Sequence, residues 1–207
     1  MTVGLNSNIK KNEFKRKHQN LVIVLDISGS MGFGFNFVYG GSNKAEKSKM
    51  VVANEAVVTL IKKLAPTDRF GLIIFDDYAE IVQRLDLISE IDVDVLINKV
   101  LSLKSRGGTN FEAGYNAAIN LYQELNKDAF NDNEYFNRVI VCTDAQPNIG
   151  STDPNSLLNM VKSYGNSKEN KLKNHIYTSF IGIGLDFNTK LIEIISNVRG
   201  SNYYAVK

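Results

Sequence analysis

Cysteine and histidine are scarce in this chain of 207 residues, and its net charge is small. The single cysteine, Cys142, excludes an intrachain disulfide. It ends the apolar run 139–142, so we expect a small buried core residue rather than a reactive thiol. The formal net charge of +2 gives no indication of a nucleic-acid partner.

Long apolar runs are absent as well. None approaches the roughly 18 residues that a membrane-spanning helix needs, so we expect no membrane insertion of this domain. The first residues lack the apolar core of a signal peptide. We therefore expect an extracellular or cell-surface location if a longer parent protein is secreted, and a cytoplasmic location otherwise.

The scarcity of histidine argues against an enzyme. The chain has only His18 and His175, and neither is expected at the carboxyl ends of the strands, where a general base would be needed. A G-x-S-x-G elbow is missing, so Ser28 or Ser30 is not expected to be a nucleophile. Phosphoryl transfer to Asp26 is also disfavoured, because a serine stands two residues on, where a second acid would be expected.

The most informative segment that is present combines an apolar run with a polar turn. The run 21–25, Leu-Val-Ile-Val-Leu, is typical of a strand buried on both faces. Asp26, Ser28 and Ser30 follow it at alternate positions, and Gly29 allows a sharp turn between the serines. Three hard oxygen donors at the carboxyl end of a strand suit a hard cation such as Mg²⁺.

Hydrophobic periodicity predicts one α/β domain in which strands alternate with helices. The strands are expected at 21–25, 69–75, 79–85, 138–143, 176–183 and 202–206. The helices are expected over about twenty residues ending near 64, and at 92–103, 111–125, 155–164 and 189–198. The turn at Asp76 and Asp77 makes 79–85 the antiparallel partner of 69–75. The fold class is therefore a doubly wound, mostly parallel six-stranded sheet with one antiparallel edge strand and helices on both faces.

Two parts of this organisation need separate mention. Residues 1–19 are a polar lead-in, in which 2–5 could add a short strand and the basic cluster at 10–17 is expected to be solvated. The main domain is 20–207. The apolar stripe of its first helix is expected at Met50, Val51, Ala53, Val57, Val58, Leu60 and Ile61.

Further oxygen donors are expected at the same edge of the sheet as the first turn. Thr109 lies in a Gly-Gly-Thr-Asn loop just before a helix, and Asp144 follows the strand 138–143. In doubly wound sheets ligands bind outside the carboxyl ends of the strands. Asp26, Ser28, Ser30, Thr109 and Asp144 would then converge. Because none of them is Cys or His, the set favours Mg²⁺, Mn²⁺ or Ca²⁺ over Zn²⁺ or copper.

The pattern D-x-S-x-S, then a distant T and a distant D, resembles the metal-ion-dependent adhesion site of von Willebrand factor type A (VWA) domains. The stretches 68–75, 107–110 and 143–148 are similar to the same family, and the resemblance extends over residues 20–206. It implies a Rossmann-like VWA fold. It also implies that a helix normally found after the last strand is lacking here.

The resemblance also implies roles for the five residues. Ser28 and Ser30 would coordinate the metal through their hydroxyls, and Thr109 directly or through water. Asp26 and Asp144 would act through water or as hydrogen-bond acceptors. The implied function is divalent-metal-dependent protein–protein binding, as in cell adhesion, in which a Glu or Asp of the partner completes the metal shell.

Alternatives remain open at this point. The same site could dock a subunit in an assembly or regulatory module of an ATPase or transport complex, or the ion could be purely structural. The chain is expected to be part of a larger protein. The segment 32–44 is longer than is usual in the family, and its aromatic residues could either contact a partner or pack on the domain. These rim residues are Phe33, Phe35, Phe37 and Tyr39.

Overall fold

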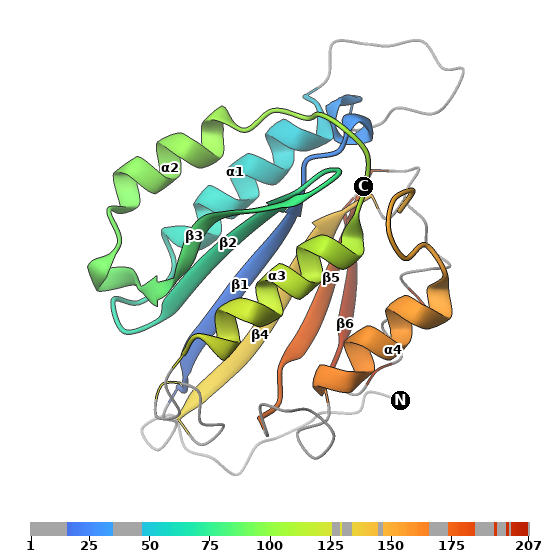
Figure 1. Ribbon diagram of the computed structural model, residues 1–207. Helices are drawn as coiled ribbons and strands as arrows, with labels where there is room; N and C mark the ends of the chain where they lie inside the picture. The colour runs from blue at the N-terminus through green and yellow to red at the C-terminus, as the bar shows by residue number, and fades with distance from the viewer. Residues whose placement is uncertain are drawn as a thin grey trace, which may run out of the picture.

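The computed structural model describes residues 16–34, 47–125, 129, 134–144, 147–165, 174–184, 193, 198 and 200–206. Its strands are β1 (His18–Asp26), β2 (Arg69–Phe75), β3 (Ala79–Leu87), β4 (Tyr135–Thr143), β5 (Tyr177–Ile183) and β6 (Asn202–Val206). They form one sheet in the order β3-β2-β1-β4-β5-β6 (Figure 1). Only β3 is antiparallel to its neighbour. The predicted fold class is confirmed.

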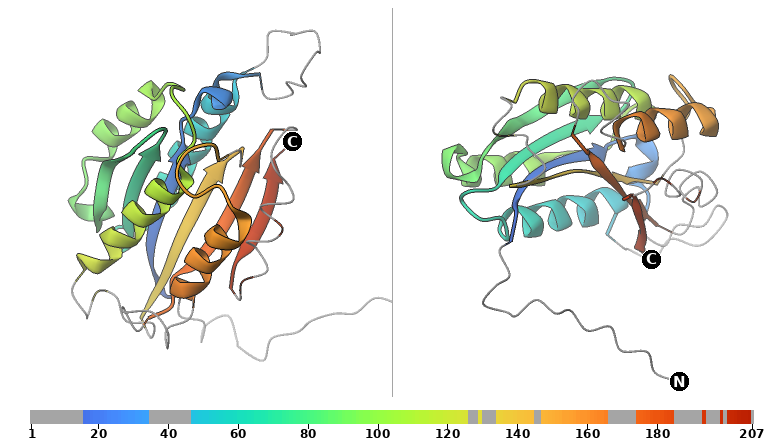
Figure 2. Two further views of the ribbon diagram at one scale, coloured as in Figure 1. Left: turned by 45° about the vertical axis from the view of Figure 1, so that its right-hand side comes forward. Right: turned by 90° about the horizontal axis from the view of Figure 1, so that it is seen from below.

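Helices cover both faces of this sheet. They are α1 (Lys49–Ile61), α2 (Val93–Ser102), α3 (Phe111–Gln123) and α4 (Pro154–Gly165), with short 3₁₀ helices η1 (Gly29–Gly32) and η2 (Ile88–Glu90). Figure 2 shows α1 on one side of the sheet and α3 and α4 on the other. Among the described residues, no helix has both the length and the apolar character to cross a bilayer.

The central strand β1 is buried on both faces, as its apolar run predicts. Val22 and Val24 belong to the core beneath α3 and α4, whereas Leu21, Ile23 and Leu25 belong to the core beneath α1 and α2. A parallel strand covered by helices on both faces has no solvent side and therefore no alternation of polar and apolar residues. This burial fixes the position of the polar turn that follows the strand.

Cys142 is a core residue, as predicted. It is 7% exposed and lies in the core on the α1 side of the sheet. Burial, with the negative charge of Asp26 adding to it, raises the pKa of the thiol to about 12. The thiol is therefore protonated and unreactive at neutral pH.

Several predicted boundaries were wrong. The first helix ends at Ile61 and has 13 residues, so it is shorter than predicted. Val51 is 41% exposed and does not belong to its buried stripe. The strand predicted from 138 begins at Tyr135, where Tyr-Phe-Asn extends the ladder with β1. The strand predicted at 2–5 and most of the helix predicted at 189–198 lie outside the described residues.

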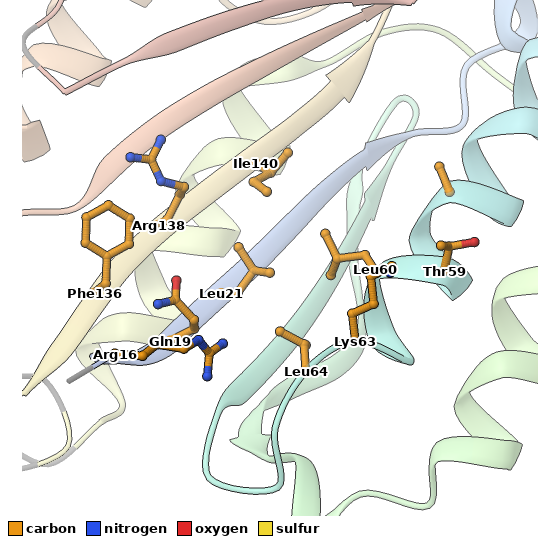
Figure 3. A pocket seen from close by; sticks show the side chains of 11 residues that line it. Arg16, Gln19, Leu21, Thr59, Leu60, Lys63, Leu64, Phe136, Arg138 and Ile140 are labelled. Carbon is orange, nitrogen blue, oxygen red and sulfur yellow. The ribbon is translucent and has the colours of Figure 1, made fainter. Parts of the chain in front are cut away.

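A mostly apolar groove of about 570 Å³ lies on the α1 side of the sheet (Figure 3). Leu21 of β1, Phe136 and Arg138 of β4, and Leu60 and Leu64 from the end of α1 contribute to its walls. Arg138 lies against the rings of Phe136 and Tyr177. The groove is lined by the amino-terminal parts of β1 and β4, so it is separate from the turns at their carboxyl ends.

Candidate functional site

Asp26 ends β1 and is completely buried at the carboxyl edge of the sheet. Its Oδ1 accepts a hydrogen bond from the backbone N–H of Ser28 at 2.8 Å, and its Oδ2 accepts one from the hydroxyl of Thr143 at 2.6 Å. The carboxylate therefore ties the turn after β1 to the end of β4.

The segment from Ser28, which precedes η1, to Ser30 within it is called the serine turn here, and it presents two serine hydroxyls next to each other. The Oγ atoms of Ser28 and Ser30 are 3.1 Å apart. The backbone N–H of Gly29 donates to the carbonyl of Gly107 at 3.0 Å, and the N–H of Arg106 donates to the carbonyl of Ile27 at 2.6 Å. These bonds hold the loop before α3 against the serine turn.

Thr109 lies in that loop and is almost fully buried. Its N–H donates to Oδ1 of Asn148 at 2.8 Å, and its carbonyl accepts from the N–H of Asn148 at 3.1 Å. The N–H of Gly108 donates to Asp77 at 2.7 Å, and Asn110 caps α3 by accepting from the N–H of Ala113. Thr109 is therefore fixed between the β2–β3 hairpin and the loop after β4.

Asp144 directly follows β4 and is also completely buried. Its Oδ2 accepts a hydrogen bond from Nζ of Lys49 at 3.1 Å, and both side chains are inaccessible to solvent. Its Oδ1 is buried without a hydrogen-bond partner among the described residues. An orphaned carboxylate oxygen is costly to bury, so Oδ1 is suited to accept a ligand or a water.

The electrostatics of the two carboxylates are coupled. Burial raises the pKa of Asp26 to about 7, and the negative charge of Asp144 adds to the shift. Hydrogen bonds from Ser28 and Thr143 oppose that rise. The charge of Asp144 therefore disfavours ionisation of Asp26, and a bound cation would favour it.

The oxygen atoms brought together at this edge fit a hard cation. Asp26, Ser28, Ser30 and Asp144 come from the carboxyl ends of β1 and β4, and the loop of Thr109 is bonded to the same turn. Hydroxyl and carboxylate oxygens are the ligands that Mg²⁺ and Mn²⁺ accept. Within the described ranges, no three Cys, His, Asp or Glu side chains are grouped as a metal site, so a cation at this edge would depend on the hydroxyls.

Sequence reasoning did not find the residues that hold the five candidate residues in place. Lys49 was missed because lysine is seldom buried, although its position at the start of the helix after the serine turn is a usable signal. Thr143 was missed as a partner of Asp26, and Asn148 as the clamp on Thr109, because both contacts join distant segments.

The rim of the site carries exposed apolar side chains. Phe33 is 43% exposed, whereas the other predicted rim residues, Phe35, Phe37 and Tyr39, lie outside the described residues. Tyr78 in the hairpin turn and Ile149 beside Asn148 are also exposed, and neither stood out in the sequence. These three exposed apolar side chains lie on loops that follow β1, β2 and β4.

An ion pair supports the hairpin on this rim. Arg106 donates to Asp76 at 2.6 Å. Burial alone would raise the pKa of Asp76, but hydrogen bonds from the N–H of Tyr78 and from Arg106 outweigh it and lower the pKa. Asp76 is thus a carboxylate at neutral pH that holds the loop of Thr109 in position.

Both histidines lie away from this edge, as expected. His18 begins β1 and contacts the hydroxyl of Thr67 at 3.0 Å. His175 stacks on Tyr177 at the start of β5. Both are therefore at the amino ends of their strands.

Comparison with known proteins identifies the same fold. The von Willebrand factor type A domain family matches residues 21–146. The heavy chain 4 of inter-alpha-trypsin inhibitor from Mus musculus is 28% identical over 177 residues, which cover 84% of this chain and 16% of the relative. The chain thus spans about one sixth of the length of such relatives.

Solved structures agree with this assignment at the level of fold. A von Willebrand factor type A protein from Catenulispora acidiphila has a TM-score of 0.69 at 19% identity, covering 92% of this chain and 39% of that chain. The manganese-loaded TRAP protein of Plasmodium vivax has a TM-score of 0.62 at 19% identity, covering 91% and 68%. The family match spans more than half of the chain, and the chain therefore belongs to the von Willebrand factor type A domain family.

Proposed function

We propose that this domain binds a divalent cation at the carboxyl edge of its sheet and uses the cation to bind a protein partner. The observation that carries the proposal is the buried carboxylate of Asp144, whose Oδ1 has no partner among the described residues. It belongs to the same edge as Asp26 and the paired hydroxyls of Ser28 and Ser30. Mg²⁺ is the expected ion, with Mn²⁺ or Ca²⁺ as possible substitutes.

The residues have distinct roles in this proposal. Ser28, Ser30 and Thr109 hold the cation through neutral hydroxyls, and Asp26 and Asp144 act through hydrogen bonds or water. Because few carboxylates would touch the ion, it stays electrophilic, and Mg²⁺ readily keeps exchangeable waters. When bound, the metal supplies a Lewis-acidic position for a Glu or Asp of the partner.

The surface around the site suits a protein partner. Phe33, Tyr78 and Ile149 are exposed on three loops that meet at this edge, and aromatic residues are enriched in protein interfaces. We propose that Phe35, Phe37 and Tyr39 extend this rim. The function is non-catalytic, and the manganese-loaded relative from Plasmodium vivax gives a precedent for a metal in this fold.

The proposal is tested by calorimetric titration with Mg²⁺ and Mn²⁺. Asp26→Ala and Thr109→Ala should each weaken binding at least tenfold, a loss of about 1.4 kcal/mol or more. Ser30→Ala removes only a half-buried hydroxyl, so it tests the same site if either of the other two variants fails to fold. Ser102→Ala on α2, whose hydroxyl bonds to the carbonyl of Lys99, is the control and should bind as the wild type does. Equal affinity in all variants would overturn the proposal.

The open coordination position needs a separate measurement. Bound Mn²⁺ should enhance the relaxation of water protons, and acetate should reduce that enhancement by replacing a metal-bound water. Acetamide has nearly the same shape without the charge and should have little effect. If acetate and acetamide act alike, the metal does not select a carboxylate.

A further inference from the structure

We propose that Lys49 is a permanent counter-ion of the metal site, which weakens cation binding and leaves the bound cation in need of an anionic partner. The inference rests on the proposed metal site. It assigns to a lysine, which is not itself a ligand, the control of how strongly the site binds metal and partner.

The geometry of Lys49 is unusual for a lysine. Its side chain is completely buried, and its Nζ lies 3.1 Å from Oδ2 of Asp144, which is buried to the same degree. Its backbone N–H donates to the carbonyl of Phe33 at 3.0 Å, so the residue is fixed beside the serine turn. The ammonium thus holds one oxygen of Asp144 and leaves Oδ1 to face another ligand.

Stability alone is a poor explanation for this pair. Removing two charges from water costs several kilocalories per mole for each ion, and well-packed apolar residues can often replace such a pair without loss. The pair also lies next to Asp26, a second buried carboxylate at the same edge. A role in the charge balance of the site accounts for both observations.

The charges at the site show what Lys49 changes. When a cation is bound, it favours the ionised carboxylates of Asp26 and Asp144. The ammonium group that pairs with Asp144 then leaves the protein with a net charge of −1 at the site. A divalent cation then leaves the centre at +1, which attracts the carboxylate of a partner. Without the ammonium, the two carboxylates would neutralise the cation, so the metal would bind more tightly and the partner more weakly.

The experiment compares Lys49→Met with the wild type. Methionine has a similar length and no charge, so the affinity for Mg²⁺ should rise about tenfold. Acetate should displace water from bound Mn²⁺ at a roughly tenfold higher concentration than in the wild type. The metal-free variant should melt at a lower temperature, because Asp144 loses its counter-ion, and Mg²⁺ should raise that temperature more than it does in the wild type.

Two further variants complete the design. Lys49→Gln keeps a hydrogen-bond donor for Asp144 and should show the same shifts if Lys49→Met does not fold. Lys47→Met is the matched control, because Lys47 lies two residues away and pairs with Glu55 in solvent. It should change neither metal nor acetate binding.

The possible results separate this inference from the proposed function. If the wild type binds Mg²⁺ and both variants at position 49 bind it with equal or lower affinity, the counter-ion role is wrong and the metal site stands. If the wild type itself binds no divalent cation, the proposed function fails, and the inference about Lys49 fails with it.

Discussion

At the scale of single residues, Asp68 links the segment that leads into β1 to the turn before β2. Its carboxylate accepts two hydrogen bonds from Arg16 and one each from the N–H groups of Gln19 and Ala65. Burial alone would raise the pKa of Asp68, but these hydrogen bonds outweigh it and lower the pKa. The residue therefore stabilises the fold in its ionised form, at the end of the sheet opposite the proposed metal site.

Replacing Asp68 should have a pH-dependent cost. Asp68→Asn should lower the free energy of unfolding at pH 7 by about 2 kcal/mol, because several hydrogen bonds to a charged group are weakened. The stabilisation is complete above the unfolded pKa and is lost as the pH falls below about 4 through the lowered folded pKa. Urea unfolding at pH 7 and pH 3 should show the difference shrinking at the lower pH.

An exposed carboxylate provides the control for that measurement. Glu124 pairs with Arg84 on the surface, with half or more of each side chain exposed. Glu124→Gln should change the free energy of unfolding by less than about 1 kcal/mol at either pH. An equal loss in both variants would contradict the special role of Asp68.

The five proposed metal-site residues could be predicted from sequence because their types and order form a pattern. Lys49 and Asn148 could not, since each acts through a contact with a distant segment. Composition rules place lysine on the surface, and a buried ammonium becomes recognisable only when its carboxylate partner is located.

At the scale of elements, the packing of α3 on β2 controls the position of the site. Gly114 lies on the buried face of α3, where an added Cβ would come within 2.8 Å of the ring of Phe75. The helix begins two residues after Thr109 and is capped by Asn110. Close contact between Gly114 and Phe75 therefore holds the loop of Thr109 near the serine turn.

Gly114→Ala should lower stability despite the higher helix propensity of alanine. The gain of roughly 0.5–1 kcal/mol in propensity is outweighed by overpacking, which typically costs about 1–3 kcal/mol. We expect a net loss of about 1 kcal/mol in urea unfolding and weaker Mg²⁺ binding in calorimetry. Asn116→Ala, on the exposed face of the same helix, should be neutral or slightly stabilising. A stabilised Gly114→Ala would show that α3 moves freely on the sheet.

Element boundaries were predictable where turn residues enclose an apolar run. The strand 69–75 lies between Asp68 and the turn at Asp76 and Asp77, and its predicted bounds agree with β2. The start of β4 was missed because Tyr135, Phe136 and Asn137 follow a polar stretch without a break in composition. The ladder with β1, a long-range contact, decides that boundary.

At the scale of the whole molecule, the segments around the candidate site are joined by the protein's own hydrogen bonds. Backbone hydrogen bonds join the serine turn, the loop of Thr109 and the β2–β3 hairpin, and Asn148 joins the loop after β4 to Thr109. We therefore expect the protein to unfold in a single cooperative transition in EDTA. We expect folding not to depend on a metal.

Metal should nevertheless stabilise the folded state. At a free Mg²⁺ concentration of about 100 times Kd, binding adds about 2.7 kcal/mol. For a domain of this size each kilocalorie raises Tm by roughly 2–4 °C, so a shift of about 5–10 °C is expected in calorimetric melting. Asp26→Ala, which weakens binding at least tenfold, should reduce the shift by about half or more. A protein unfolded in EDTA, or a Tm insensitive to Mg²⁺, would contradict this expectation.

The overall topology followed from the alternation of strands and helices, since short right-handed connections leave few alternatives. The groove between α1 and β4 did not follow from it. Its walls depend on where α1 ends and on which face of the sheet Phe136, Arg138 and Ile140 point. Those are results of three-dimensional packing, and a one-dimensional pattern does not contain them.

The bridge between Gly34 and Ser48 has a consequence for protein engineering. Gly34 lies just after η1 and Ser48 lies just before α1, and the two residues form an antiparallel pair. The two positions that flank residues 35–47 are therefore held next to each other beside the candidate site. Doubling the length of a connection costs only about 0.6 kcal/mol in closure entropy. The pair is therefore a natural grafting point, where foreign peptide sequences can be exchanged and displayed next to a cation without redesign of the sheet.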